Sequence, residues 1–114
     1  MLLSELMSVI DYNEVINRTG IETAQTQVAS LCFDSRKASA NSMFVCIPGA
    51  LADGHDYAEA AYKDGCRIFV TEHRTSLPDD AFIIITGDTR VALARLSAVF
   101  FGYHLFVHFQ CNLK

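Results

Sequence analysis

The stretch AFIIITGDTRVALARLSAVF, residues 81–100, contains a strand, a turn and a helix in immediate succession. Residues 81–86 form a short apolar run of β-compatible residues, which is typical of a strand buried inside a sheet. Gly87 and Asp88 interrupt this run, and aspartate is a preferred N-cap at the start of a helix. Apolar residues then form a face wide enough for a well-buried helix, at Val91, Ala92, Leu96, Val99 and Phe100. The pattern predicts a strand and a covering helix that ends at Gly102.

The same alternation of strands and helices precedes this stretch. Further strands are predicted from apolar, β-compatible runs at residues 28–34, 43–47 and 66–71. Apolar residues at helical spacing predict helices over residues 3–10 and 57–62. A capping box across residues 56–59 is expected to open the second helix, and Gly65 is expected to close it in a left-handed conformation. Residues 11–27 are polar and are predicted to be an irregular connection.

The composition fits one folded domain. The chain has 114 residues, of which 51% are hydrophobic and 19% are charged, so we expect a folded rather than a disordered chain. The formal net charge is −4 and no cluster of Lys and Arg is present, which argues against a nucleic-acid partner. We expect a single α/β domain with a mixed or mostly parallel sheet covered by helices.

The cysteines and the N-terminus indicate a cytoplasmic protein. None of the four cysteines lies in a C-x-x-C pair, so we expect buried thiols in a reducing compartment rather than a disulfide or a metal site. Residues 1–5 do not resemble the start of a secretory signal. No apolar run reaches the roughly 18 residues of a membrane span, so no membrane partner is expected.

Asp34-Ser35-Arg36 lies where a predicted strand meets a loop, and ligands of open α/β sheets gather at the carboxyl ends of strands. A serine hydroxyl and an arginine fork suit a phosphate or the edge of a base. The alternative is that Asp34 and Ser35 satisfy backbone groups of a turn while Arg36 lies in solvent. The residues alone leave both interpretations open.

The loop over residues 48–56 contains two glycines, which let backbone N–H groups approach a ligand. It is not a phosphate-binding P-loop, because no Gly-Lys-Ser/Thr follows. His55 in this loop is interpreted as a cap or surface residue rather than a catalytic base. The start of the last predicted helix, at Asp88, offers either an ordinary cap or an anion site. No nucleophile–base pattern is present, so no catalytic residue and no metal ligand is predicted.

Taken in order, these motifs resemble the N-terminal domain of the Mur ligases, most of all the UDP-N-acetylmuramoyl-tripeptide synthetases of that family. The resemblance covers residues 2–102 and rests on motif order and spacing. The motifs are Leu31-Cys32-Phe33-Asp34-Ser35-Arg36, Met43-Phe44-Val45-Cys46-Ile47-Pro48-Gly49, Asp53-Gly54-His55-Asp56-Tyr57, Gly65 before a strand, Asp88-Thr89-Arg90, and Phe100-Phe101-Gly102.

The resemblance implies a domain that holds the UDP end of a UDP-N-acetylmuramoyl peptide, within an ATP- and Mg²⁺-dependent ligase of peptidoglycan biosynthesis. It implies roles in the cell wall, cell shape and cell division. Phe33 and Ser35 match the family's uridine-contacting positions, and Ala50, Leu51 and Ala52 match a loop along the uridine. Arg36 and His55 are secondary candidates.

Two positions depart from the family pattern. Asn41-Ser42 replaces the usual Gly-Asp, and asparagine tolerates a left-handed turn best among non-glycine residues. Residues 103–114 replace the linker and the ATP-binding loop. We therefore expect residues 1–102 to form the substrate domain, the central ATPase and C-terminal domains to be absent, and residues 103–114 to be a divergent tail from a truncation or frameshift. Such a chain would bind substrate, use no cofactor and catalyse nothing alone.

Two alternatives remain. The first is that the chain is a stand-alone regulatory or interaction domain of the same fold. The second is that it is the first domain of the related ligase that adds D-Ala-D-Ala. In the first case the apolar tail would be a surface for self-association, through Leu105, Phe106, Val107 and Phe109.

Overall fold

A single sheet forms the centre of the molecule. The computed structural model describes residues 1–49 and 54–112, and the side chains of these residues except 54–55 and 103–112. Within them, five strands lie in the order β1-β5-β4-β3-β2. Strands β2 to β5 are mutually parallel, and β1 runs antiparallel beside β5. The strands are β1 (Glu14–Ile16), β2 (Ser30–Cys32), β3 (Ser42–Val45), β4 (Ile68–Thr71) and β5 (Phe82–Ile85).

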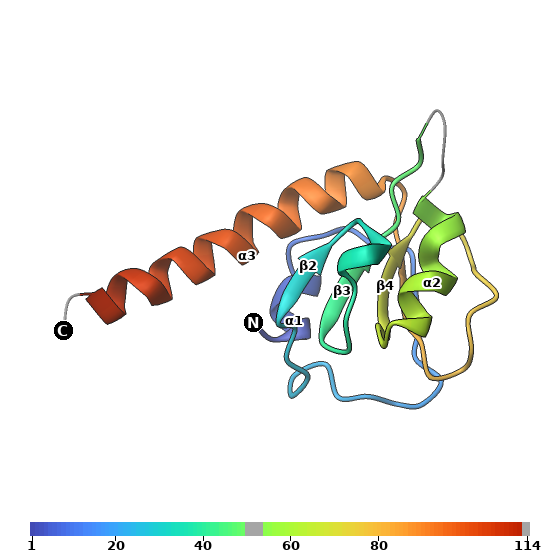
Figure 1. Cartoon of the computed structure of the whole chain (residues 1–114), viewed down its shortest axis with the longest axis horizontal. Coiled ribbons are helices and arrows are strands. Elements are labelled where there is room, and N and C mark those ends of the chain that lie inside the picture. Colours follow the sequence, from blue (N-terminus) through green and yellow to red (C-terminus); the bar gives the residue numbers. More distant parts are fainter. Residues whose placement is uncertain (50–53, 113–114) are drawn as a thin grey trace.

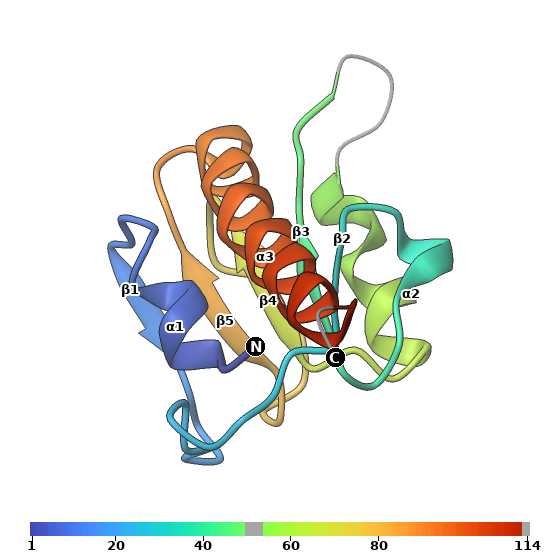
Figure 2. The same cartoon turned by 90° about the vertical axis from the view of Figure 1, so that its left-hand side faces the viewer.

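Helices cover both faces of this sheet. The helices α1 (Leu3–Met7) and α3 (Thr89–Asn112) lie on one face, and α2 (Ala58–Lys63) lies on the other (Figures 1 and 2). The chain also has two short 3₁₀ helices. The first, η1 (Ser35–Lys37), follows β2, and the second, η2 (Gly54–Tyr57), directly precedes α2. The predicted α/β domain with a mixed, mostly parallel sheet is confirmed.

The apolar runs are explained by burial on both faces of the sheet. Met43 and Val45 pack into the core under α1 and α3, while the alternate residues Phe44 and Cys46 pack into the core under α2. Every residue of β3, β4 and β5 is buried. A strand in this position has no solvent face, so its sequence does not alternate with polar residues.

The three cysteines whose side chains are described are buried thiols, as predicted. They are Cys32, Cys46 and Cys66. Burial raises the pKa of the Cys32 thiol to about 11. Burial also raises the pKa of the Cys66 thiol. The Cys32 and Cys66 thiols therefore remain protonated at neutral pH and behave as small apolar side chains.

Gly65 closes α2 in the predicted way. Its φ is +105°, and its N–H donates to the carbonyl of Tyr62 at 3.0 Å, while the N–H of Cys66 donates to the carbonyl of Ala61 at 3.1 Å. These two bonds form a Schellman motif. A Cβ atom at this position would lie 3.3 Å from the backbone nitrogen of Ala40, so both conformation and space favour glycine.

Three local predictions were wrong. Residues 14–16 form β1 rather than part of an irregular connection, because they pair with the free edge of β5. Gly102 does not end α3, which continues to Asn112 and extends away from the sheet (Figure 1). A glycine costs a helix only about 1 kcal/mol, and no proline follows here. The capping box is not formed, since α2 begins after η2 without a side-chain cap. The turn at Asn41 is retained, as predicted, although Asn41 has no positive φ.

Candidate functional site

The carboxyl edge of the parallel strands brings separate segments of the chain together. Residues 33–36 follow β2, Pro48 and Gly49 follow β3, and the start of α3 follows β5. The segment after β3 and the start of α3 lie at the same end of the sheet (Figure 1). Arg90, in the first turn of α3, donates a hydrogen bond to the carbonyl of Pro48 and joins two of these segments.

A hollow of about 470 Å³ opens at this edge. It is lined by Phe33, Asp34, Ser35, Arg36 and Tyr57. The rings of Phe33 and Tyr57 are 62% and 46% exposed, although the remainder of the domain buries most of its large apolar side chains. Exposed aromatic rings beside polar groups are typical of a surface that binds a planar ligand. The structure therefore places the predicted residues Phe33, Ser35 and Arg36 in one site.

Asp34 and Arg36 form a two-point ion pair within this hollow. The Arg36 Nε and Nη2 atoms lie 3.1 and 2.8 Å from the two carboxylate oxygens of Asp34. The Arg36 backbone N–H also donates to Asp34 Oδ1 at 3.0 Å, which makes Asp34 the N-cap of η1. These hydrogen bonds from the side chain and backbone of Arg36 lower the pKa of the Asp34 carboxyl to about 2. Asp34 thus satisfies the turn, as the simpler interpretation expected, but Arg36 is paired rather than free.

Ser35 carries a hydroxyl group to which no described residue is hydrogen-bonded. Its side chain is half-buried and lines the hollow. Within the described part of the chain its hydroxyl makes no hydrogen bond, and only its backbone carbonyl is engaged, by the N–H of Ala38 at 3.2 Å. A hydroxyl with spare donor and acceptor capacity can bond to a ligand without breaking an internal contact.

The N-terminus of α3 is occupied by protein carboxylates. Asp88 Oδ1 accepts from the N–H groups of Arg90 and Val91 at 2.9 and 3.2 Å, which confirms it as the N-cap. Glu72, just after β4, accepts from the N–H and hydroxyl of the buried Thr89 at 3.0 and 3.1 Å. Two negative charges here compete with any external anion, so the capping interpretation holds and the anion-site interpretation does not.

A smaller hollow of about 290 Å³ lies beside the end of β5. Its lining includes Asp11, Asp88, Val91 and Arg95, and the Arg95 guanidinium pairs with the Asp11 carboxylate at 3.4 Å. It contains none of the predicted uridine-contacting residues. Its carboxylates also disfavour a phosphate-bearing ligand.

Several predicted residues cannot be compared with the structure. Ala50, Leu51 and Ala52 lie outside the described residues, as does the side chain of His55. The side chains of the predicted self-association surface also lie outside the described range. Conversely, Tyr57 lines the hollow but was not predicted as a site residue. Its signal was present, because an aromatic residue ends the quoted motif just before a helix.

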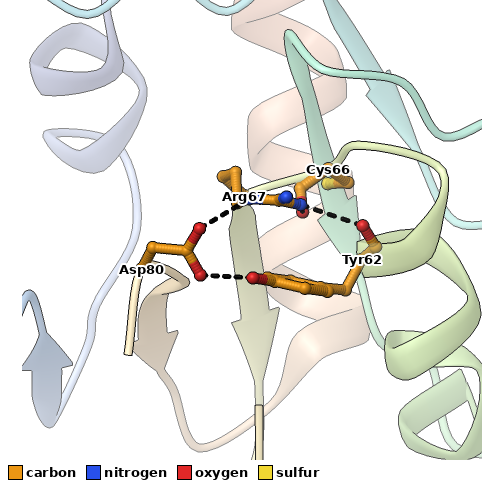
Figure 3. Close-up of polar contacts among 4 residues, drawn as sticks. All are labelled: Tyr62, Cys66, Arg67 and Asp80. Atoms are coloured by element: carbon orange, nitrogen blue, oxygen red, sulfur yellow. Dashed lines mark hydrogen bonds and ion pairs between the residues drawn. The ribbon is translucent and has the colours of Figure 1, made fainter. Parts of the chain in front are cut away.

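A polar cluster of Tyr62, Arg67 and Asp80 lies at the opposite, amino edge of the sheet (Figure 3). The Tyr62 hydroxyl donates to Asp80 Oδ1, and Arg67 Nε donates to Asp80 Oδ2 at 3.1 Å. The Arg67 guanidinium carbon lies 3.8 Å from the centroid of the Tyr62 ring and its Nη1 donates to the carbonyl of Tyr62 at 2.9 Å. These groups saturate one another, so the cluster holds α2 against the starts of β4 and β5 rather than binding a ligand.

This cluster predicts an acid-dependent contribution to stability. The hydrogen bond from Tyr62, aided by Arg67, lowers the pKa of Asp80 in the folded state. The contribution is therefore present above the unfolded value of about 4 and is lost as the pH falls through the folded value. We expect Asp80→Asn to lower the unfolding free energy at pH 7, with a difference from wild type that shrinks below about pH 4.

Urea unfolding from pH 7 to 2 measures this difference. Tyr62→Phe, which removes only the hydroxyl donor, should show the same pH trend with a smaller amplitude. A difference that stays constant across the range would show that Asp80 does not act through its charge.

The comparison with known proteins identifies the family. The family described as "Mur ligase family, catalytic domain" matches residues 27–100. The chain belongs to the Mur ligase family. The resemblance predicted from the motifs is confirmed.

Relatives within this family are ligases named for a UDP-N-acetylmuramoyl substrate. The UDP-N-acetylmuramoyl-L-alanyl-D-glutamate--2,6-diaminopimelate ligase of Clostridium perfringens is 36% identical over 102 residues, which is 90% of this chain and 20% of that protein. The corresponding ligase of Bacillus licheniformis is 41% identical over 75 residues, covering 66% of this chain and 15% of that protein. UDP-N-acetylmuramyl-tripeptide synthetase 2 of Oceanobacillus iheyensis is 36% identical over 77 residues, covering 67% of this chain and 16% of that protein.

A solved Mur ligase confirms the fold. The UDP-N-acetylmuramoylalanyl-D-glutamyl-2,6-diaminopimelate--D-alanyl-D-alanyl ligase of Acinetobacter baumannii superposes with a TM-score of 0.72 over 85% of this chain and 20% of that chain. The identity is 23%, so this likeness concerns the fold alone. The present Mur ligase chain spans about a fifth of the length of the relatives it matches. Among the described residues, no helix has the length and apolar character needed to span a membrane.

Proposed function

We propose that this chain binds the UDP end of a UDP-N-acetylmuramoyl peptide in the hollow beside β2. The observation that carries the proposal is the pair of exposed rings, Phe33 and Tyr57, next to the Ser35 hydroxyl, which no described residue engages. Aromatic rings stack on any nucleobase, while a hydroxyl can read the hydrogen-bonding edge of one. The choice of a uridine nucleotide is supported by relatives that are named UDP-N-acetylmuramoyl-L-alanyl-D-glutamate--2,6-diaminopimelate ligases.

The proposed role is recognition without chemistry, as part of peptidoglycan-precursor synthesis in the cytoplasm. In the proposed parent reaction, ATP with Mg²⁺ would activate a carboxylate of the substrate. The residues present do not fit that pair. The sequence lacks a Gly-Lys-Ser/Thr loop, and the described residues include no cluster of His, Cys, Asp and Glu suited to a metal. We therefore assign the ATP-dependent step to parts of a longer ligase.

Calorimetry tests the proposal with UDP-N-acetylmuramoyl-L-alanyl-D-glutamate, UDP and ATP as ligands. We expect both uridine ligands to bind, ATP not to bind, and Ser35→Ala to weaken uridine binding by roughly threefold to tenfold through loss of one hydrogen bond. The matched control is Ser76→Ala, an exposed serine in the β4–β5 connection, which should leave the affinity unchanged.

A folded chain that binds none of the ligands at millimolar concentration would contradict the proposal. That result would favour the alternative of a non-catalytic interaction domain. Equal binding of ATP and UDP would show instead a hollow that does not select uracil.

A further inference from the structure

The hollow contains a cation whose charge is already matched by the protein. Among the described residues that line it, Arg36 is the one cationic side chain, and Asp34 is its partner. The Arg36 side chain is 87% exposed, so solvent or a ligand can reach it. Its Nε and Nη2 atoms nonetheless face the two oxygens of a carboxylate. Arginine commonly binds a phosphate group through two-point geometry of this kind, and Asp34 occupies one of the two edges of the guanidinium that can provide it.

Asp34 is also fixed in place by the backbone. Its Oδ1 atom accepts the N–H of Arg36 at 3.0 Å, which caps η1 directly after β2. The carboxylate therefore does not depend on the arginine side chain for its position. A diphosphate that approached the outer Nη1/Nη2 edge of Arg36 would meet a guanidinium whose charge is already neutralised, and it would be repelled by the neighbouring carboxylate.

From this geometry we infer that Asp34 determines which part of a nucleotide the hollow recognises. By occupying one edge of the Arg36 guanidinium and neutralising its charge, Asp34 directs binding toward the base, through Phe33, Tyr57 and Ser35, and away from the diphosphate. This inference rests on the proposed function and adds a specificity-determining residue to it. Asp34 acts on the ligand through Arg36, so we regard it as a positioning residue.

Binding of three probes separates the base from the phosphates. The probes are uridine, UDP and inorganic pyrophosphate, each measured by calorimetry at low and high salt. Asp34→Asn removes the negative charge but keeps a side-chain oxygen that can cap η1, so the local fold is retained. Asp79→Asn makes the same charge change at the far, amino edge of the sheet, where Asp79 pairs with Arg18 at 2.6 Å. It is the matched control.

The wild type is expected to bind uridine and UDP with affinities within about threefold of each other, because its arginine adds little for the phosphates. Asp34→Asn is expected to raise the affinity for UDP relative to uridine by about fivefold, and to gain measurable pyrophosphate binding. Both gains should fall at high salt, because exposed charges are screened. Asp79→Asn should change none of these ratios.

Two results would overturn the inference. One is a wild type that already prefers UDP to uridine by more than about tenfold with a steep salt dependence. The other is an Asp34→Asn variant with unchanged UDP-to-uridine ratio and no pyrophosphate binding. Failure of the proposed function looks different: no variant would bind uridine, whatever pyrophosphate does.

Discussion

Replacing Phe33 by alanine is expected to weaken uridine-nucleotide binding by about tenfold or more, because stacking of one base on one aromatic ring contributes about 1–3 kcal/mol. The ring is 62% exposed in the free protein and lines the hollow. Its removal therefore costs the ligand a stacking surface but costs the core almost nothing. The unfolding free energy should change by less than about 0.5 kcal/mol.

Titration of the variant with UDP, paired with urea unfolding, measures both quantities. Phe33→Tyr is the matched control, since it keeps the ring and should bind within about twofold of wild type. An alanine variant that is folded and binds with unchanged affinity would show that the base does not stack on Phe33.

Replacing Phe69 by alanine is expected to lower the unfolding free energy by about 3–5 kcal/mol. Phe69 lies in the middle of β4, is fully buried, and packs edge to face on Phe44 of β3 with ring centroids 6.2 Å apart. The truncation would leave a cavity between the sheet and α2, because the closely packed neighbouring side chains can relax only partly into the empty space. A loss of this size is a large fraction of the roughly 5–15 kcal/mol that stabilises a domain.

Urea unfolding gives the loss directly if the denaturant dependence of the two proteins is the same. Phe101→Ala is the control for truncation of a phenylalanine at the surface, because Phe101 is 61% exposed on α3. It should cost less than about 0.5 kcal/mol. Similar losses for the two variants would contradict the assignment of Phe69 to the core under α2.

The central part of the fold could be predicted because its sequence pattern does not depend on which distant segments pair with it. Each of β3, β4 and β5 is a continuous apolar run, which predicts a strand buried on both faces whichever strand lies beside it. Asp88 and Gly65 mark a helix start and a helix end through local backbone chemistry, and both lie where predicted.

β1 could not be predicted for the opposite reason. Its three residues, Glu14–Ile16, are only half-buried and lie in a polar stretch, so they show no period of their own. They form a strand because β5, about seventy residues later in the chain, offers a free edge. The continuation of α3 past Gly102 was not predicted, because Gly102 was interpreted as a helix end although a single glycine does not necessarily end a helix.

The candidate site was predicted in part. The motif around Ser35 predicted that Phe33 and Ser35 lie together at the end of a strand. Which other residues lie beside them depends on the packing of segments that are distant in the sequence. Tyr57 reaches the same hollow from η2, and the sequence cannot show that these segments meet. The ion pair of Arg36 could not be predicted either, because the sequence alone does not distinguish an arginine that is paired from one that lies in solvent.

The most direct measurement is a map of UDP-N-acetylmuramoyl-L-alanyl-D-glutamate binding on the isotopically labelled chain by NMR. Binding in the proposed hollow predicts saturable shifts of the backbone amides of residues 33–37 and Tyr57, with little change around Asp11 and Arg95. Shifts confined to the smaller hollow near Asp11 and Arg95, or no shifts at millimolar ligand, would contradict uridine recognition at this site.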